Sequence, residues 1–167
     1  MSVESLLLGY IREAWPGVAA GGDPVRLQGL LDAAARVSRH NEAVLEALPA
    51  RDAWPPLCRP MFAWPPLDDP MIAFRARLIH FAACQNQLDQ DLRAWLDKFE
   101  GLLRRLYWEG AYVRVETAYI GAQEFRWRPT GEWVSDLCKG VLRPITAWSF
   151  EGTMSIDDIA RLGTPDV

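Results

Sequence analysis

Histidine and cysteine, two residue types that could carry out chemistry, come together at His80 and Cys84. On a helix, residues four apart share a face, so the two could provide ligands to a zinc ion. Cys58, Cys138 or His40 would have to complete the set, and no CxxC spacing brings further thiols together. The simpler interpretation is a half-buried histidine beside a core cysteine. We therefore predict no metal site, and no cysteine nucleophile, because no acid that would orient His80 is evident.

Motifs for nucleotide binding and hydrolysis are not found in the sequence, which contains no GxxxxGK[ST], GxGxxG or GxSxG. The neighbouring carboxylates of the chain suit structural roles better than catalysis. Asp157 and Asp158, for example, fall in the first turn of a predicted helix, where acids favour the helix dipole. We predict no cofactor and no catalytic residue, and we favour a function other than catalysis.

Arginine and aromatic side chains alternate in the segment FRWR, where Arg126 and Arg128 flank Trp127. Together with Arg114 and Tyr112, this composition is typical of platforms that stack single-stranded nucleic acid. Two observations argue against such a partner. The net charge is −4 and the sequence pI is about 5.2. Glutamates of the same region would also pair with these arginines across strands, which predicts a solvated, ion-paired sheet face; they are Glu116, Glu124 and Glu132.

Tryptophan is unusually frequent, with eight residues in the chain, and tryptophan with arginine is the combination enriched at interaction hot spots. Five are predicted to be core anchors: Trp15, Trp54, Trp64, Trp95 and Trp108. The other three, Trp127, Trp133 and Trp148, fall in a predicted small sheet, and such a sheet leaves one of its faces open to a partner. The predicted partner-binding residues are therefore Arg114, Arg126, Trp127, Arg128, Trp133 and Trp148.

The element that must position these groups is a long apolar stripe with alternating steps of three and four. It consists of Met71, Phe74, Leu78, Phe81, Gln85, Leu88, Leu92, Trp95, Phe99, Leu102 and Leu106. This spacing predicts one very long helix over about 70–107, about 55 Å at about 1.5 Å per residue, packed as in a coiled coil. Its seam could pack within the chain or join two copies in a homodimer.

Gln85 is the one polar residue of this stripe, and a buried amide needs a hydrogen-bond partner. One interpretation is a ligand pocket between the long helix and the sheet, formed by His80, Gln85 and Tyr112. The other is a partly exposed position where the helix leaves the core, and this one we favour.

The remaining segments complete one predicted domain over 1–167 of the α+β class, mainly helical. Two N-terminal helices within 1–48 cover about 2–15 and 24–48, the second opened by Asp23 and Pro24. A connector over 49–69 repeats AWPPL and is predicted to be extended. Residues 111–150 predict a small antiparallel meander, and 153–163 a short helix capped by Ser155.

Composition limits the setting of this domain. Three scattered cysteines indicate reduced thiols, the N-terminal segment lacks a basic region before its apolar run, and no segment reaches the roughly 18 apolar residues of a membrane span. We therefore predict a cytoplasmic protein without membrane contact.

Three functions stay open at this stage. The leading hypothesis is a non-catalytic protein-binding module, such as an immunity-type inhibitor or an accessory subunit, which recognises a protein partner through its Trp and Arg sheet face. The acidic balance of the chain suits a basic partner. The alternatives are a small-molecule-binding or enzymatic domain with the pocket above, and a single-stranded nucleic-acid binder.

Overall fold

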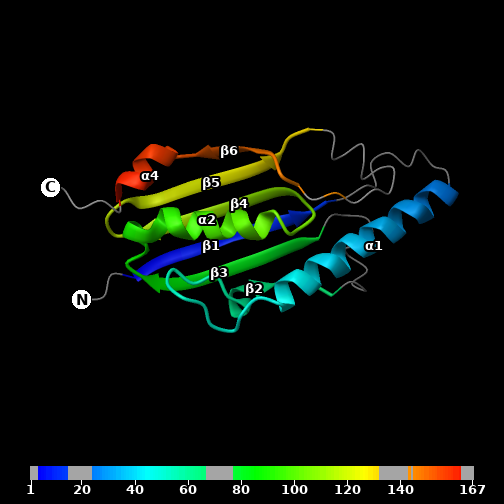
Figure 1. Cartoon of the computed structure of the whole chain (residues 1–167), viewed down its shortest axis with the longest axis horizontal. Helices are drawn as coiled ribbons and strands as arrows, with labels where there is room; N and C mark the ends of the chain where they lie inside the picture. Colours follow the sequence, from blue (N-terminus) through cyan, green and yellow to red (C-terminus); the bar gives the residue numbers. More distant parts are fainter. Residues whose placement is uncertain (1–3, 15–23, 67–76, 132–142, 144, 163–167) are drawn as a thin grey trace.

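A six-stranded antiparallel sheet forms the centre of the computed structural model, with the strand order β2-β3-β1-β4-β5-β6 (Figure 1). The structure describes residues 4–14, 24–66, 77–131, 143 and 145–162. The strands are β1 (Glu4–Glu13), β2 (Phe62–Ala63), β3 (Leu78–Asn86), β4 (Trp108–Thr117), β5 (Gly121–Pro129) and β6 (Trp148–Gly152). The helices are α1 (Pro24–Glu46), α2 (Leu92–Leu103) and α4 (Ile156–Leu162), with short 3-10 turns η2 (Arg59–Met61) and η3 (Leu88–Asp91).

The predicted mainly helical fold and its very long helix over 70–107 are both wrong. The described part of that stretch contains β3, η3 and α2 in succession, followed by the start of β4; Met71 and Phe74 lie outside the described residues. Two features explain why this segment does not form the single helix that its apolar spacing predicts. Residues 78–86 also alternate with period two and pair along their whole length with β1. Gln87 then adopts a left-handed conformation, with φ 57°, which no α-helix contains.

The first predicted helix, over 2–15, is also wrong, because residues 4–13 form β1. This strand is central, with β3 on one side and β4 on the other, so both of its backbone edges are hydrogen-bonded. Its inward side chains are the alternating Ser5, Leu7, Ile11 and Glu13. A run that is apolar on both faces fits helix and central strand alike, which explains the error. Trp15 lies outside the described residues.

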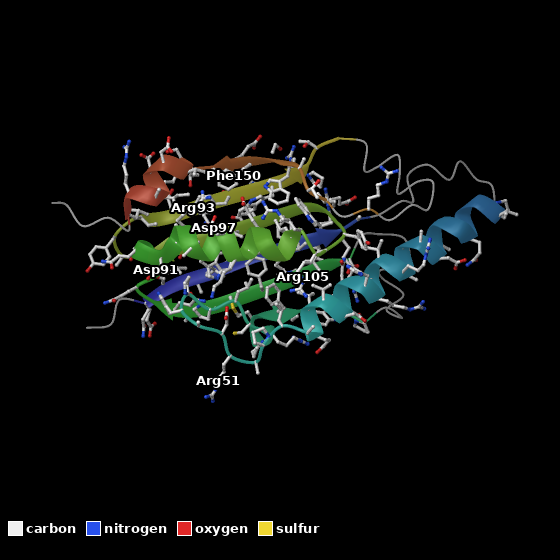
Figure 2. All side chains as sticks on the ribbon, in the orientation of Figure 1. Arg51, Asp91, Arg93, Asp97, Arg105 and Phe150 are labelled. Atoms are coloured by element: carbon white, nitrogen blue, oxygen red, sulfur yellow. The ribbon has the colours of Figure 1, made fainter. Side chains whose placement is uncertain are left out.

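The core lies between α2 and one face of the sheet. Six α2 side chains are buried: Leu92, Trp95, Leu96, Phe99, Leu102 and Leu103. Phe99 is at their centre, with ring centroids 5.3 Å from Phe81 and Trp95 and 5.2 Å from Trp127. The outer side of α2 is polar, and there Arg93 forms an ion pair with Asp97 at 2.8 Å (Figure 2). An amphipathic helix on an aromatic sheet face therefore forms the core.

The described part of the connector, 49–66, is tied down by side-chain hydrogen bonds. Lys98 of α2 donates through Nζ to Asp52 and to the carbonyls of Ala53 and Pro55, each at 2.9 Å. The Trp95 indole donates to the Pro56 carbonyl at 3.1 Å. Within the connector, only the two residues of β2 pair in the sheet, so these contacts replace the ladder bonds that the rest of the described segment lacks. The predicted anchor Leu57 is buried, and so is Met61, whereas the predicted anchor Trp54 is 48% exposed.

The predictions for the C-terminal part of the chain and for the second helix agree better with the structure. Residues 111–150 do contain an antiparallel meander, formed by β4, β5 and β6, although it is half of a larger sheet rather than a separate small one. Helix α1 occupies the place of the second predicted helix, and α4 that of the last one. The Ser155 hydroxyl accepts from the backbone N–H of Asp158 at 3.1 Å, as a helix cap does.

A buried ion pair joins α1 to the sheet. Arg77 and Glu13 are each 2% exposed, and the Arg77 fork binds both oxygens of Glu13, at 2.9 and 3.1 Å. Its other N–H groups donate to Glu42 and to the carbonyls of Ser38 and Pro65, so all five donors are used. Glu13 in turn accepts from Ser38 and Asn41 of α1.

This network predicts the effect of removing one partner. The Arg77→Met variant leaves the Glu13 carboxylate buried without a cation, and we expect the free energy of unfolding to fall by about 3–5 kcal/mol. Urea unfolding followed by circular dichroism measures this change. Because the Arg77→Met, Glu13→Leu double variant carries no buried charge at these positions, we expect it to lose less than the single variant. A single-variant loss below about 1 kcal/mol would show that the pair is solvated.

Two glycines give a matched pair of predictions. A Cβ on Gly9 would overlap the backbone oxygen of Tyr112 and lie 2.5 Å from Cζ of Phe81, whereas a Cβ on Gly101 of α2 meets nothing within 4 Å. We expect Gly9→Ala to destabilise the protein by about 1–3 kcal/mol. Gly101→Ala should stabilise it by about 0.5–1 kcal/mol through helix propensity. Thermal unfolding of the two variants checks the opposite signs.

Candidate functional site: the open face of the sheet

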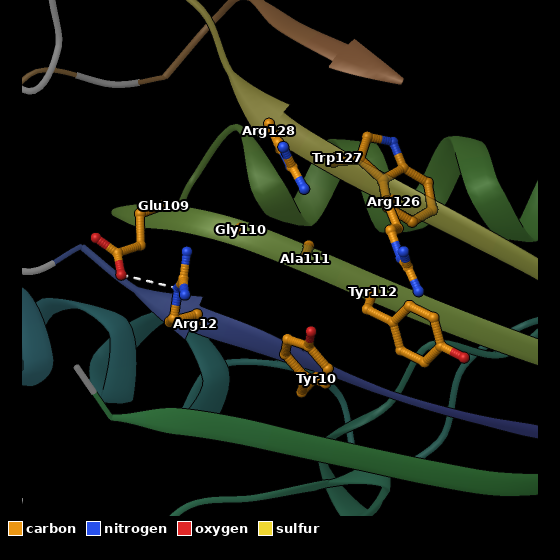
Figure 3. A pocket seen from close by; sticks show the side chains of 9 residues that line it. All are labelled: Tyr10, Arg12, Glu109, Gly110, Ala111, Tyr112, Arg126, Trp127 and Arg128. Carbon is orange, nitrogen blue, oxygen red and sulfur yellow. Dashed lines mark ion pairs between the residues drawn. The ribbon is translucent and has the colours of Figure 1, made fainter. Parts of the chain in front are cut away.

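Opposite the core, the sheet has a second face, called here the open face. Its side chains include Glu4, Leu6, Leu8, Tyr10 and Arg12 of β1, His80, Ala82, Cys84 and Asn86 of β3, Tyr112, Arg114 and Glu116 of β4, Glu124, Arg126 and Arg128 of β5, and Ser149 and Glu151 of β6. Every one of them is exposed or half-buried. Figure 3 views this face, with α2 behind the sheet. None of the described helices covers it.

Aromatic rings and an arginine form one row across the open face. Tyr10 pairs with His80 on one side and Tyr112 on the other, and Tyr112 pairs with Arg126. The two tyrosine rings stack with centroids 5.5 Å apart, and the Arg126 guanidinium lies 5.2 Å from the centre of the Tyr112 ring. Such cation–π contacts hold a guanidinium in place without neutralising its charge.

A hollow of about 600 Å³ lies beside this row, and it is called here the Gly110 pocket. Its lining includes Tyr10, Arg12, Gly110, Tyr112, Arg126 and Arg128 (Figure 3). Gly110 pairs with Arg12 across β1 and β4. A Cβ at position 110 would meet only the Arg12 guanidinium, at 3.7 and 3.9 Å. The missing side chain therefore leaves the hollow open between arginines of neighbouring strands.

An irregularity in β4 shapes the pocket. The β1–β4 register shifts between Arg12 and Glu13, so that Gly110 and Trp108 pair with them and Glu109 is the extra residue. The bulge lets Trp108 point into the core, where it is fully buried. It also brings Glu109 to the pocket, where its carboxylate binds Nε of Arg12 at 2.8 Å.

The pocket is positively charged in a chain that is negative overall. Three arginines, Arg12, Arg126 and Arg128, and one glutamate, Glu109, line it, which leaves an excess of two positive charges, whereas the chain carries −4. Among the residues that the structure describes, Arg126 has one distant ion pair, with Glu124 at 3.7 Å. Arg128 forms no ion pair with any residue that the structure describes. The local field therefore favours an anion.

The other end of the open face is ion-paired, as the sequence predicted. Arg114 donates through Nε to Glu116 at 2.7 Å and through Nη1 to Glu124 at 3.2 Å. Its charge is therefore neutralised by two carboxylates. The predicted partner-binding residues Arg114, Arg126 and Arg128 do share one face, but they divide between an ion-paired part and the pocket.

The predicted tryptophans do not belong to this face. Trp127 is fully buried on the core side, where its indole donates to Glu100 at 3.0 Å. Trp148 lies on the same core side against Trp108, with ring centroids 6.0 Å apart. Trp133 lies outside the described residues. In a strand, Trp127 must point away from Arg126 and Arg128, so the FRWR segment cannot present all three to one partner.

The predicted pocket of His80, Gln85 and Tyr112 does not form. His80 and Tyr112 are on the open face, on either side of Tyr10. Gln85 faces the core, is 6% exposed, and donates to the Pro56 carbonyl at 3.3 Å. Because the very long helix does not exist, neither does the predicted cleft beside it, and a homodimer seam on that helix has no basis.

His80 and Cys84 share the open face but cannot share a metal. Four residues of β-strand separate their Cα atoms by about 13 Å, roughly twice the distance on a helix. Within the described residues, no group of three or more histidine, cysteine, aspartate or glutamate side chains is arranged to hold a metal ion. Cys138 lies outside the described residues.

Sequence reasoning missed half of the pocket. Four lining residues were not predicted, because the apolar spacing of residues 2–15 also fits a helix and the bulge in β4 carries no clear signal in the sequence; they are Tyr10, Arg12, Glu109 and Gly110. The alternation of Leu6, Leu8, Tyr10 and Arg12 was visible in the sequence and is typical of a strand face.

Comparisons with protein-family models, curated proteins and solved structures find no match to this chain. In the part of the chain that the structure describes, no helix combines the length and apolar character of a membrane span.

The open face predicts how Tyr112 titrates. Burial, and then the nearby Glu124 carboxylate, raise the pKa of Tyr112, while Arg114 lowers it less. The folded state therefore holds this proton more tightly than the unfolded state, and the associated stability is lost as the pH rises through the pKa of Tyr112. In an alkaline titration of tyrosinate absorbance, Tyr112→Phe should remove a late-ionising tyrosine, and Glu124→Gln should lower the pKa of Tyr112. Loss of an early-ionising tyrosine in Tyr112→Phe, or an unchanged pKa of Tyr112 in Glu124→Gln, would contradict the assignment.

Proposed function

We propose that this chain is a recognition module that binds a protein partner through the open face of its sheet. The observation that carries the proposal is the cluster of exposed tyrosine and arginine side chains around the Gly110 pocket. Tyrosine and arginine are enriched at interaction hot spots, because they combine a large contact area with directional hydrogen bonds.

The size and composition of the open face support a protein partner. The six strands hold 45 residues (10, 2, 9, 10, 9 and 5). At a rise of about 3.3 Å per residue and a strand spacing of about 4.8 Å they give a face of roughly 700 Å², close to the about 800 Å² that each protein contributes to a standard interface. Exposed apolar surface shares this face with the charged groups, since Leu6 is 36% and Tyr10 39% exposed. A mixed surface of this kind is typical of interfaces between separately folded proteins.

The charge of the pocket determines the chemistry of the partner. The overall charge of −4 suggested a basic partner, but contacts are made locally, and the lining of the pocket carries an excess of two positive charges. The partner is therefore expected to place an acidic group in the pocket. Complementary charge at this position would both orient the partner and speed its association.

The charge distribution also separates this proposal from nucleic-acid binding. Tyrosines and arginines could stack bases, but Glu4, Glu116 and Glu124 occupy the other end of the same face. A polynucleotide that crossed the face would bring its phosphates against these carboxylates. A discrete acidic group on a folded partner avoids this repulsion.

Site-specific crosslinking tests the proposal. A photoreactive phenylalanine analogue replaces Tyr112 on the open face, and in a control variant it replaces Ala94, which is exposed on α2. In extract of the native host, we expect one protein to be captured from position 112 and not from position 94. The captured protein is then purified and its binding to the intact chain is measured by calorimetry.

Charge-reversal variants then test whether the purified partner binds at the Gly110 pocket. The Arg126→Glu, Arg128→Glu variant should bind the purified partner at least ten-fold more weakly, whereas Arg51→Glu, at an exposed connector site (Figure 2), should bind within two-fold of the parent chain. Equal binding by all three proteins, or equal capture from positions 112 and 94, would refute the open face as the working surface.

A further inference from the structure

We infer that the Gly110 pocket takes a phosphate monoester carried on a side chain of the protein partner. This inference rests on the proposed function and makes it more specific. The pocket joins three guanidinium groups, two tyrosine rings and a backbone position without a side chain, and these features must suit one ligand group.

Charge is the first argument. The three arginines and the one glutamate of the lining leave an excess of two positive charges. A phosphate monoester carries about −1.5 to −2 at neutral pH, whereas a carboxylate carries −1. Counted over the lining, a phosphate balances the pocket and a single carboxylate leaves one cation uncompensated. Glu124, outside the lining, lies 3.7 Å from Arg126 and offsets part of this excess.

The number of acceptor atoms is the second argument. Arg12 approaches the pocket from β1, whereas Arg126 and Arg128 approach from β5, on the other side of β4 (Figure 3). One bidentate arginine fork already uses both oxygens of a carboxylate. A phosphate monoester has three terminal oxygens, which arginines on different sides can share.

Preorganisation is the third argument. The Glu109 carboxylate holds Arg12 at 2.8 Å, and the Tyr112 ring lies under Arg126 at 5.2 Å. Both cations are therefore positioned before a ligand arrives, which reduces the entropy lost on binding. Gly110 leaves room between the strands, because a Cβ there would point at the Arg12 guanidinium at 3.7 Å.

The tyrosines indicate how the rest of the ligand is oriented. Tyr10 and Tyr112 stack beside the arginines and continue the pocket across β1 and β4. Their rings offer an apolar surface to the stem of a phosphorylated side chain, whose phosphate then reaches the arginines. A hollow of about 600 Å³ is larger than a lone phosphate needs. It lies within the range of pockets that enclose organic ligands, about 300–1,000 Å³.

Titration of the full chain tests the pocket itself. The probes are phosphoserine and phosphotyrosine, each flanked by alanines in a short peptide, with matched peptides that carry glutamate or unmodified serine. Binding is followed by amide chemical-shift changes in NMR spectra. We expect saturable binding of the phosphopeptides, at least ten-fold tighter than the glutamate peptide, with shifts centred on Gly110 and Arg128.

Variants locate the binding. Arg128→Gln and Arg12→Gln should each weaken the phosphopeptide at least ten-fold, Arg128→Lys should weaken it less than Arg128→Gln, and the control Arg51→Gln should leave it within two-fold. Arg128 and Arg51 are both exposed, so neither change should disturb folding. Equal loss in Arg51→Gln would overturn the site. Equal affinity for the glutamate peptide and the phosphopeptides would refute the inference that the pocket takes a phosphate.

The source of the phosphate is tested separately. Adenosine monophosphate and inorganic phosphate are titrated alongside the peptides, and either one binding ten-fold tighter than both phosphopeptides would overturn the side-chain assignment. Failure of this inference is distinguishable from failure of the proposed function. If a partner crosslinks to position 112 and binds equally well before and after phosphatase treatment, the phosphate inference is refuted and the proposed function stands. If phosphopeptides bind but no partner is crosslinked, the phosphate site stands and the protein-binding proposal is refuted.

Discussion

The ion pair between Glu13 and Arg77 sets the orientation of the central strand. Because Glu13 must point inward to reach Arg77, its neighbour Arg12 must point to the open face, and Tyr10 with it. A shift of β1 by one residue would expose Glu13 and bury Arg12 without an acid partner. The cost of a buried unpaired charge is several kcal/mol, so the register is strongly specified. The same pair binds α1, which supplies Ser38 and Asn41 to the Glu13 carboxylate.

The bulge at Glu109 lies at the same end of the sheet and follows from the packing there. Trp108 turns into the core beside Glu13, so β4 must accommodate one extra residue before regular pairing resumes at Gly110. That residue, Glu109, becomes the partner of Arg12. Packing on one face and the pocket on the other are therefore two results of a single irregularity. An added residue in a strand re-aims its neighbours, which is why bulges recur beside binding sites.

The sequence allowed correct prediction where local signals decide the structure. Helix α1 begins at Pro24, where the capping signal placed it, and the alternation of Val113, Arg114 and Val115 predicted β4. The errors arose where long-range pairing decides. Residues 78–86 satisfy both a helical and a strand pattern, and only the nine-residue ladder with β1 selects the strand. With β1 missing, Tyr10 and Arg12 could not be placed beside Tyr112, so only three of the pocket's open-face side chains were predicted, those of Tyr112, Arg126 and Arg128.

Charge segregation explains how an acidic chain can present a site for anions. On the open face, Arg114 is held between Glu116 and Glu124 at one end, whereas Arg12, Arg126 and Arg128 gather at the other. Exposed charges more than about 10 Å apart are largely screened at moderate salt, so a bound group responds to its nearest neighbours rather than to the net charge. Glu4 and Glu116, at the far end, then act against extended polyanions without weakening a compact one, whereas Glu124 bridges the two parts of the face because it pairs with both Arg114 and Arg126. A face with this arrangement selects ligands by the size of the anion as well as by its sign.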